Sequence, residues 1–373
     1  MTRSKLAVAA VLVVVVATGG VVTGTTPGTV DSAQSAQAVD CSYPIEVTDA
    51  TGATVTVDQE PQRVVALSPS AAQVMWEIGA SEKVVGMPVG PTTAYLNGST
   101  DRTNVLNSKL QPITEKVVGL NPDLVLAPNV VDNETVRNLR SKGLTIVRFE
   151  AATSIADVTA KTRLTGRLVG EYEGAARVSA RTAAIAERVR EVTDSGEDPT
   201  VYYTLGGGYT AGSATFVGDV VASAGGDNIA SAADIGTYGV ISEEVIVAQN
   251  PDWIAMPEGR SLRQSAAINA TTAVEDGRIV SLDGNFLSQP GPRLVEPLTR
   301  LAGTFHPRTA GDLTVTVSPA SVPACADGGP AFATNGTVTV EIPANEDARR
   351  AADPANGTST DTGSGFGPGF GPV

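Results

Sequence analysis

The chain has 373 residues, a length that suits two lobes of ordinary size better than one small domain. Forty acidic against 26 basic residues give a formal net charge of −14, which argues against nucleic acid or anionic lipid as a partner. A single histidine, His306, and two cysteines exclude sites with several imidazoles and Cys-rich zinc sites. We therefore expect no metal site and no cofactor.

Residues 1–38 have the pattern of an export signal peptide. Arg3 and Lys5 precede an apolar run at 6–17, and 36–38 offer a small-x-small cleavage site. A run of about a dozen residues is short of the roughly 20 that span a bilayer. An uncleaved N-terminal anchor is the alternative.

Residues 45–153 alternate apolar strands with helices and predict a first α/β lobe. The strand at 63–67 ends at Ser68-Pro69-Ser70, a turn that begins a helix at 71–78. Further strands are predicted at 84–87, 124–127 and 145–149, with a helix at 136–142. This alternation indicates a parallel sheet.

Residues 193–307 repeat this pattern and predict a second α/β lobe. Strands are expected at 200–205, 253–256 and 279–282, and helices at 217–224 and 293–302. A short β-type extension is expected at 308–343. Trp76 and Trp253 fall on a predicted helix and strand, so we interpret both as core residues.

Segments 114–125 and 242–254 resemble each other. Each reads as a short helix, then Asn-Pro-Asp, then an apolar strand. Two lobes built on one plan explain the match best, and chance similarity of two βα units is the alternative.

The segment at 154–192 contains no proline and predicts a helical connection. Apolar residues at helical spacing run through 171–192, a helix of about 22 residues and about 33 Å. Such a helix can span two lobes; a pair of helices inside one lobe is the alternative.

Residues 344–373 have no periodic apolar pattern, so we expect a disordered stalk. The stalk ends near Pro368-Gly369-Phe370, which resembles the PGF sorting signal at the C-terminus of archaeal surface proteins. The apolar helix that follows the triplet in those proteins is not present here, and a plain flexible end is the alternative. The acidic, lysine-poor composition is typical of proteins from high-salt organisms.

The chain resembles a family of substrate-binding proteins of ABC importers, those for vitamin B12, ferric siderophores or haem. The resemblance covers roughly residues 46–307 and is carried by segments 49–57, 61–70, 78–80 and 84–86 and by both Asn-Pro-Asp strands. It implies an α/β fold of two lobes joined by one long helix, with the ligand in a cleft between them. It also implies a binding protein and not an enzyme, with an ABC permease as partner and a location at the cell surface or outside the cell. We further expect a monomer.

Within this family the ligand would lie where strand ends face each other across the cleft. The chain is poor in aromatic residues, so those in predicted loops are informative, although each alone can be a loop anchor. The residues predicted to bind the ligand are Ser68, Pro69, Tyr95, Tyr209, Phe216, Tyr238, Phe286 and Arg293.

The resemblance favours vitamin B12 or a related corrinoid as the ligand. A ferric siderophore is the alternative, and its binders often place several arginines in the cleft, where here Arg293 is the clear candidate. Haem is third, with Tyr95, Tyr209 or Tyr238 as axial ligand. Free zinc or manganese would require several converging His or carboxylate ligands.

The resemblance also implies that one acidic residue on each lobe docks on the permease. By position in the repeated motif these are Glu115 and Glu244, although a carboxylate at a helix start is also favoured by the helix dipole. In an exported protein Cys41 and Cys325 can pair, with two free thiols as the alternative.

Other chemistries find little support. Residues 206–208 are glycines but lack the P-loop lysine and the dinucleotide pattern. A hydrolase would have only His306 as a base, and its place beside Pro307 indicates a surface residue. An adhesive wall protein would show repeats and a longer stalk.

Overall fold

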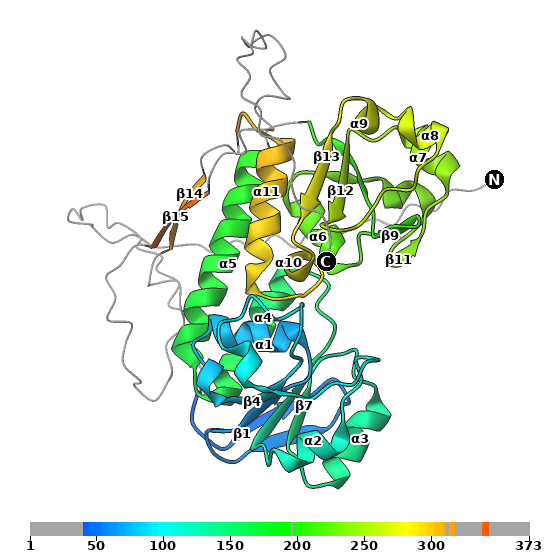
Figure 1. Ribbon diagram of the computed structural model, residues 1–373. Helices are drawn as coiled ribbons and strands as arrows, with labels where there is room; N and C mark the ends of the chain where they lie inside the picture. The colour runs from blue at the N-terminus through cyan, green and yellow to red at the C-terminus, as the bar shows by residue number, and fades with distance from the viewer. Residues whose placement is uncertain (1–39, 195–196, 310–312, 318–337, 343–373) are drawn as a thin grey trace, which may run out of the picture. The chain divides into compact units, whose positions relative to one another are not determined.

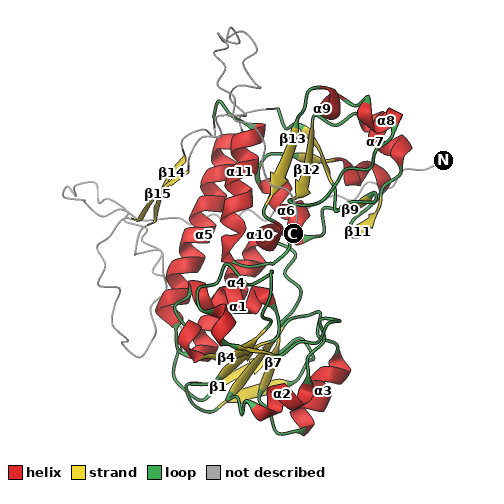
Figure 2. Ribbon diagram, in the orientation of Figure 1, coloured by secondary structure: helices red, strands yellow, loops and turns green. Residues whose placement is uncertain are grey.

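The computed structural model contains two parallel sheets, one in each half of the chain (Figure 1). The structure describes residues 40–194, 197–309, 313–317 and 338–342, the last two stretches by their backbone alone. The signal peptide predicted at 1–38 and the stalk and sorting signal predicted at 344–373 lie outside these residues. Helices and strands alternate along both halves (Figure 2).

The first lobe contains a five-stranded sheet in the order β5-β4-β3-β6-β7, and all its pairings are parallel. A hairpin of β1 and β2 precedes the sheet. The strands are β1 (Ile45–Thr48), β2 (Thr54–Val57), β3 (Val64–Ala66), β4 (Val84–Met87), β5 (Thr103–Asn104), β6 (Leu124–Ala127) and β7 (Ile146–Arg148). The helices are α1 (Pro69–Glu77), α2 (Thr114–Gly119) and α3 (Asn133–Ser141), with 3-10 turns η1 (Ser81–Lys83) and η2 (Ser99–Asp101).

The second lobe contains a four-stranded parallel sheet in the order β10-β8-β12-β13, and a separate antiparallel pair, β9 and β11. The strands are β8 (Thr200–Tyr203), β9 (Tyr209–Ala211), β10 (Asp227–Asn228), β11 (Tyr238–Val240), β12 (Trp253–Pro257) and β13 (Ile279–Leu282). The helices are α6 (Phe216–Ser223), α7 (Glu243–Gln249), α8 (Ala266–Asn269), α9 (Thr272–Glu275), α10 (Gly284–Leu287) and α11 (Val295–Phe305), with 3-10 turns η3 (Ile229–Ala233) and η4 (Pro292–Leu294).

Each sheet is buried on both faces, because successive side chains of a strand point to opposite sides. In β3, Val64 and Ala66 join one apolar cluster of the first lobe, whereas Val65 joins the cluster on the other face. In β8, Tyr203 and Tyr202 divide in the same way between the two clusters of the second lobe. The alternating hydrophobic residues of the sequence therefore build two covered α/β layers.

The two Asn-Pro-Asp motifs make equivalent contacts in the two lobes. The Asp123 carboxylate accepts hydrogen bonds from the backbone N–H groups of Gln62 and Arg63, both at 2.8 Å, just before β3. The Asp252 carboxylate accepts one from the backbone N–H of Thr200 at 2.8 Å, at the start of β8. The motif therefore fixes the start of the neighbouring strand in each lobe, which is a physical reason for the internal sequence match.

Two antiparallel helices, α4 (Ile155–Val169) and α5 (Tyr172–Thr193), connect the lobes (Figure 1). Helix α4 begins in the core of the second lobe, with Ile155, and ends in the core of the first, with Leu168. Helix α5 runs back, from Ala175 in the first core to Val189 in the second. The predicted long helix is present, and α4 forms a second crossing beside it.

Close packing at the α4–α5 turn depends on small residues. Gly170 ends α4 in the left-handed region with φ 76°. A β-carbon at Gly174 would collide with the carbonyl group of Ile78, at the end of α1. The start of α5 therefore lies directly against the first lobe.

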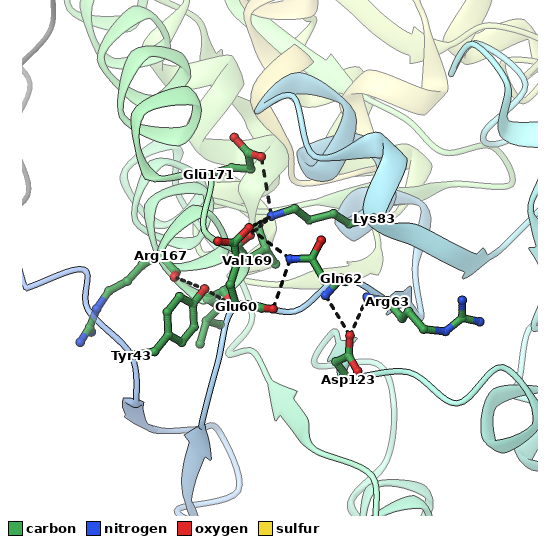
Figure 3. A network of polar contacts seen from close by, with 10 residues as sticks. Tyr43, Glu60, Gln62, Arg63, Lys83, Asp123, Arg167, Val169 and Glu171 are labelled. Carbon is green, nitrogen blue, oxygen red and sulfur yellow. Dashed lines mark hydrogen bonds and ion pairs between the residues drawn. The ribbon is translucent and has the colours of Figure 1, made fainter. Parts of the chain in front are cut away.

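A polar network fixes this turn to the first lobe (Figure 3). The Lys83 ammonium donates to Glu60 Oε1 at 2.7 Å and to the backbone carbonyl of Val169 at 2.6 Å, and lies 3.7 Å from Glu171. The Tyr43 hydroxyl donates to the carbonyl of Leu168 at 3.2 Å. Burial, together with the charges of Glu60 and Glu171, raises the pKa of Tyr43 to about 12.

Beyond the second lobe, within the predicted extension at 308–343, strands β14 (Leu313–Val317) and β15 (Val338–Ile342) pair antiparallel. Among the helices that the structure describes, none is both long enough and apolar enough to cross a bilayer.

Candidate functional site

A cleft of about 670 Å³ lies between the two lobes. Its wall follows the carboxyl ends of strands from both sheets: Ser68 comes after β3, Asn129 after β6, Leu205 after β8 and Asn285 after β13. In open α/β sheets ligands bind at this edge, because the loops that leave the strands converge there.

Most of the lining is uncharged, and part of it can form hydrogen bonds. Hydroxyl and amide side chains come from both lobes: Ser68, Ser70, Thr92, Asn129, Thr153, Thr215, Thr237, Asn285, Ser288 and Gln289. The charged lining residues are Lys161, Glu258 and Arg260. Such a surface suits a large ligand with many neutral polar groups better than a highly charged one.

Four of the eight predicted ligand residues line this cleft. Ser68 is the N-cap of α1, and its hydroxyl accepts a hydrogen bond from the backbone N–H of Ala71 at 3.1 Å, with Pro69 in the first helical turn. Phe216 is buried at the start of α6. Tyr238 on β11 is 53% exposed and provides an accessible aromatic ring in the lining. Partial burial raises the pKa of the Tyr238 phenol, so the group is neutral at neutral pH.

Tyr95, Phe286 and Arg293 do not line the cleft but meet one another where the lobes join. The Tyr95 and Phe286 rings pack edge to face with centroids 5.1 Å apart, and the Arg293 guanidinium lies over both, at 5.2 Å and 5.4 Å. Arg293 also donates to Glu77 at 2.7 Å. Burial alone would lower the pKa of Arg293, but the contact with Glu77 outweighs it and raises this pKa. The structure thus places these three side chains in an inter-lobe contact, because their partners lie on the opposite lobe.

Two glutamines that the sequence did not single out complete this contact. The Gln73 amide donates to the Tyr95 hydroxyl at 2.9 Å, and the same hydroxyl donates to Gln289 at 3.1 Å. Gln289 in turn donates to the carbonyl of Thr92 at 2.9 Å. The sequence alone gives little indication that these glutamines join the lobes. Gln73 is a polar residue on the buried side of helix α1, and Gln289 lies in the segment after the last strand of the sheet, β13.

Tyr209 also lies outside the cleft lining. It is 49% exposed on β9, directly opposite Val240 of β11. The glycine run at 206–208 makes the turn before β9, and all three residues adopt positive φ, between 63° and 94°. This requirement for positive φ accounts for the glycines without phosphate binding.

The predicted docking residues occupy equivalent positions on the two lobes. Glu115 and Glu244 are both exposed and in the first turns of α2 and α7. Among the residues that the structure describes, neither forms an ion pair. A backbone N–H at the helix start and the Ser242 hydroxyl lower the pKa of Glu244, which is therefore ionised at neutral pH.

Four further predictions from the sequence concern the histidine, the cysteines, a metal site and the tryptophans. His306 is buried, and its ring lies 2.9 Å from the carbonyl of Gly225, so the expectation of a surface residue was wrong. Cys41 is disulfide-bonded, whereas Cys325 lies outside the described residues, so their pairing stays a prediction. In the part of the chain that is described, no three His, Cys, Asp or Glu side chains come together as a metal site.

Trp76 and Trp253 pack against the cores of the first and second lobe respectively.

The sequence profile described as "Periplasmic binding protein" matches residues 64–286, from β3 to α10. The chain belongs to this family. The cobalamin-binding protein of Halobacterium salinarum is 46% identical over 286 residues, which cover 72% of this chain and 76% of the relative. The periplasmic binding protein assignment confirms the predicted fold of two α/β lobes with parallel sheets.

Two solved structures show the same fold. The periplasmic haem-binding protein RhuT of Roseiflexus, in apo form, has a TM-score of 0.59 and 25% identity, over 67% of this chain and 99% of that one. The vitamin B12 binding protein BtuF of Vibrio cholerae has a TM-score of 0.56 and 20% identity, over 65% of this chain and 95% of that one. Members of one fold thus bind different large ligands, and the side chains that line the cleft must determine which ligand is bound.

Proposed function

We propose that this protein is the extracellular substrate-binding protein of an ABC importer, that it captures vitamin B12 or a related corrinoid, and that it delivers the ligand to the membrane permease. The 46% identity to a protein named for cobalamin binding supports the ligand, and the family supports the role in import. Capture of this kind needs no chemical step, so the proposal is a binding protein and not an enzyme.

The observation that carries the proposal is the inter-lobe cleft, with its largely uncharged wall, its hydroxyl and amide side chains from both lobes and its accessible aromatic ring. A corrin ring is broad, and its periphery carries neutral amides. The hydroxyl and amide side chains of the cleft match that periphery, and Tyr238 can pack on an apolar part of the ring.

A ferric siderophore or haem is the second candidate. The phenol of Tyr238 in the cleft is the observation that favours it, since a tyrosine oxygen is a suitable iron ligand. Arg293, which the sequence suggested for an anionic chelate, pairs with Glu77 outside the cleft lining and so does not support this candidate.

The test is a calorimetric titration with cyanocobalamin, haem and a ferric siderophore, each with a matching thermal unfolding series. Saturable binding of cyanocobalamin should stabilise the protein, by about 2.7 kcal/mol at a ligand concentration of 100 times Kd. Absence of binding, or a response to the iron ligands alone, would reject the corrinoid.

A matched pair of tyrosine variants locates the ligand. Tyr238→Ala should weaken binding, because this ring lines the cleft, whereas Tyr209→Ala on the paired strand should leave it unchanged. Equal losses of affinity from both variants would contradict binding in the cleft and would place the ligand elsewhere on the β9–β11 pair.

A further inference from the structure

Lys161 places a positive charge in a cleft whose wall is otherwise mostly neutral. It lies on α4, the connecting helix that starts in the second lobe and ends in the first. The side chain is half-buried, and its ammonium lies 6.0 Å from the centroid of the Phe149 ring. Lys161 therefore comes from neither sheet but from the element that both lobes share.

No described residue neutralises this charge by an ion pair or by a hydrogen bond to the ammonium. The nearest candidate on its own helix is Asp157, but the carboxylate of Asp157 accepts hydrogen bonds from the backbone N–H groups of Thr153 and Ser154, at 2.9 Å and 3.0 Å. These bonds cap the start of α4. Burial lowers the pKa of Lys161, and the charge of Asp157 opposes this only in part. An unneutralised charge that is partly removed from water is costly, so its presence in a ligand cleft points to an anionic partner.

Other described lysines have different surroundings. Lys83 binds Glu60 and a backbone carbonyl, and Lys116 donates to the carbonyl of Asn104 at 3.0 Å. Lys109 and Lys142 are exposed. Lys161 thus combines partial burial with the absence of a polar partner among the described residues.

The second lobe adds another cation to the cleft. Arg260 follows β12, is exposed, and forms no ion pair with any residue that the structure describes. Among the described residues that line the cleft, Glu258 of the same loop is the one carboxylate. Two cations and one carboxylate give the lining a net charge of +1, in a chain whose net charge is −14. The cleft is therefore locally suited to an anionic group.

We propose that Lys161 is a specificity-determining residue that binds the single anionic group of the ligand, the phosphodiester of the nucleotide loop of a complete cobalamin. This inference rests on the proposed function and goes further, because it predicts that the protein distinguishes complete cobalamins from corrinoids that lack the nucleotide loop. Arg260 contributes from the second lobe through its charge. Because Lys161 is half-buried, the contact is screened by salt less than a surface ion pair would be.

The test compares cyanocobalamin with dicyanocobinamide, which has the corrin ring but no phosphodiester, by titration of the full chain at one fixed salt concentration. Lys161→Met should weaken cyanocobalamin binding by about tenfold to a hundredfold, since hydrogen bonds to charged groups are worth that much. Binding of dicyanocobinamide should be unchanged. Lys161→Arg should retain most of the affinity, and Lys142→Met, an exposed lysine, serves as the control.

Stability of the ligand-free variant separates binding from structure. Lys161→Met removes a partly buried charge that has no polar partner among the described residues, so its unfolding midpoint should equal or exceed that of the wild type. Equal losses for both corrinoids, no loss for either, or a lowered unfolding midpoint would overturn the role of Lys161 while leaving the proposed function in place. A wild-type protein that binds neither corrinoid would overturn both.

Discussion

Asp123 and Asp252 hold equivalent places in the two lobes, each fixing the backbone at the start of a central strand. Their carboxylates accept hydrogen bonds from backbone N–H groups at 2.8 Å, and Asp252 also accepts one from the hydroxyl of Thr200 at 2.8 Å. Asp123→Ala and Asp252→Ala should therefore each lower the free energy of unfolding by about 1–3 kcal/mol. The larger loss should belong to Asp252, which is less exposed.

Denaturant unfolding measures both changes, and Asp58→Ala, at an exposed position, is the control. If the two variants unfold like the wild type, the repeated motif does not stabilise the lobes.

Asp49 and Arg140 make the first lobe sensitive to acid. The side chain of Asp49 is fully buried and contacts Arg140 at 2.6 Å, Thr51 at 2.6 Å and the backbone N–H of Arg148 at 2.8 Å. Burial alone would raise the pKa of Asp49, but the hydrogen bonds outweigh it and hold this pKa below its ordinary value. The contribution to stability is therefore complete above about pH 4, where unfolded aspartate is ionised, and is lost as the pH falls through the lower native value.

Urea unfolding from pH 5 down to pH 2 tests this dependence. The difference between the wild type and Asp49→Asn should shrink as the pH falls through that window. A difference that stays constant would show that Asp49 is protonated, or that its loss acts through packing alone.

The sequence predicts the fold well because its signals are local. Alternating apolar strands, Ser68 as a helix cap and the paired Asn-Pro-Asp segments need only neighbouring residues to be interpreted. The helix over 171–192 is equally clear, and the structure has it at Tyr172–Thr193.

The site is predicted less well because it depends on contacts between distant residues. Arg293 looks like a ligand residue in the sequence, but its partner Glu77 lies 216 positions away. For Lys161 the sequence misleads in the other direction. On an amphipathic helix it resembles an ordinary surface lysine, and only the position of α4 between the lobes brings it into the cleft.

Gly174 tests whether α5 is fixed rigidly to the first lobe. A methyl group there would collide with the carbonyl of Ile78, a backbone group that cannot turn away. Gly174→Ala should therefore lower the free energy of unfolding by about 1–3 kcal/mol, despite the better helix propensity of alanine. Gly119→Ala is the matched control, since no atom lies within 4 Å of a β-carbon at that position. Stabilisation by both substitutions would show that α5 can move away from α1.

The Glu77–Arg293 ion pair should contribute to the stability of the inter-lobe contact. Its side chains are 25% and 33% exposed, and Arg293 also lies over two aromatic rings. Arg293→Gln should cost about 1–3 kcal/mol in the free energy of unfolding. Arg188→Gln breaks the more exposed pair with Glu191 and should cost less than about 1 kcal/mol. Equal effects of the two substitutions would contradict a role of Arg293 in joining the lobes.

Glu115 and Glu244 should affect delivery to the permease and leave ligand capture unchanged. Both carboxylates are exposed at helix starts, away from the cleft lining, and the proposed partner carries complementary charge. Each of Glu115→Lys and Glu244→Lys should reduce ligand uptake by the reconstituted importer by about tenfold, and the double variant further. At molar salt the Debye length is about 3 Å, so the loss must come from direct contacts, and it should persist there. Glu134→Lys, on the neighbouring α3, is the control, and titration should show unchanged ligand affinity in all four proteins. Normal uptake by the double variant would place the docking surface elsewhere.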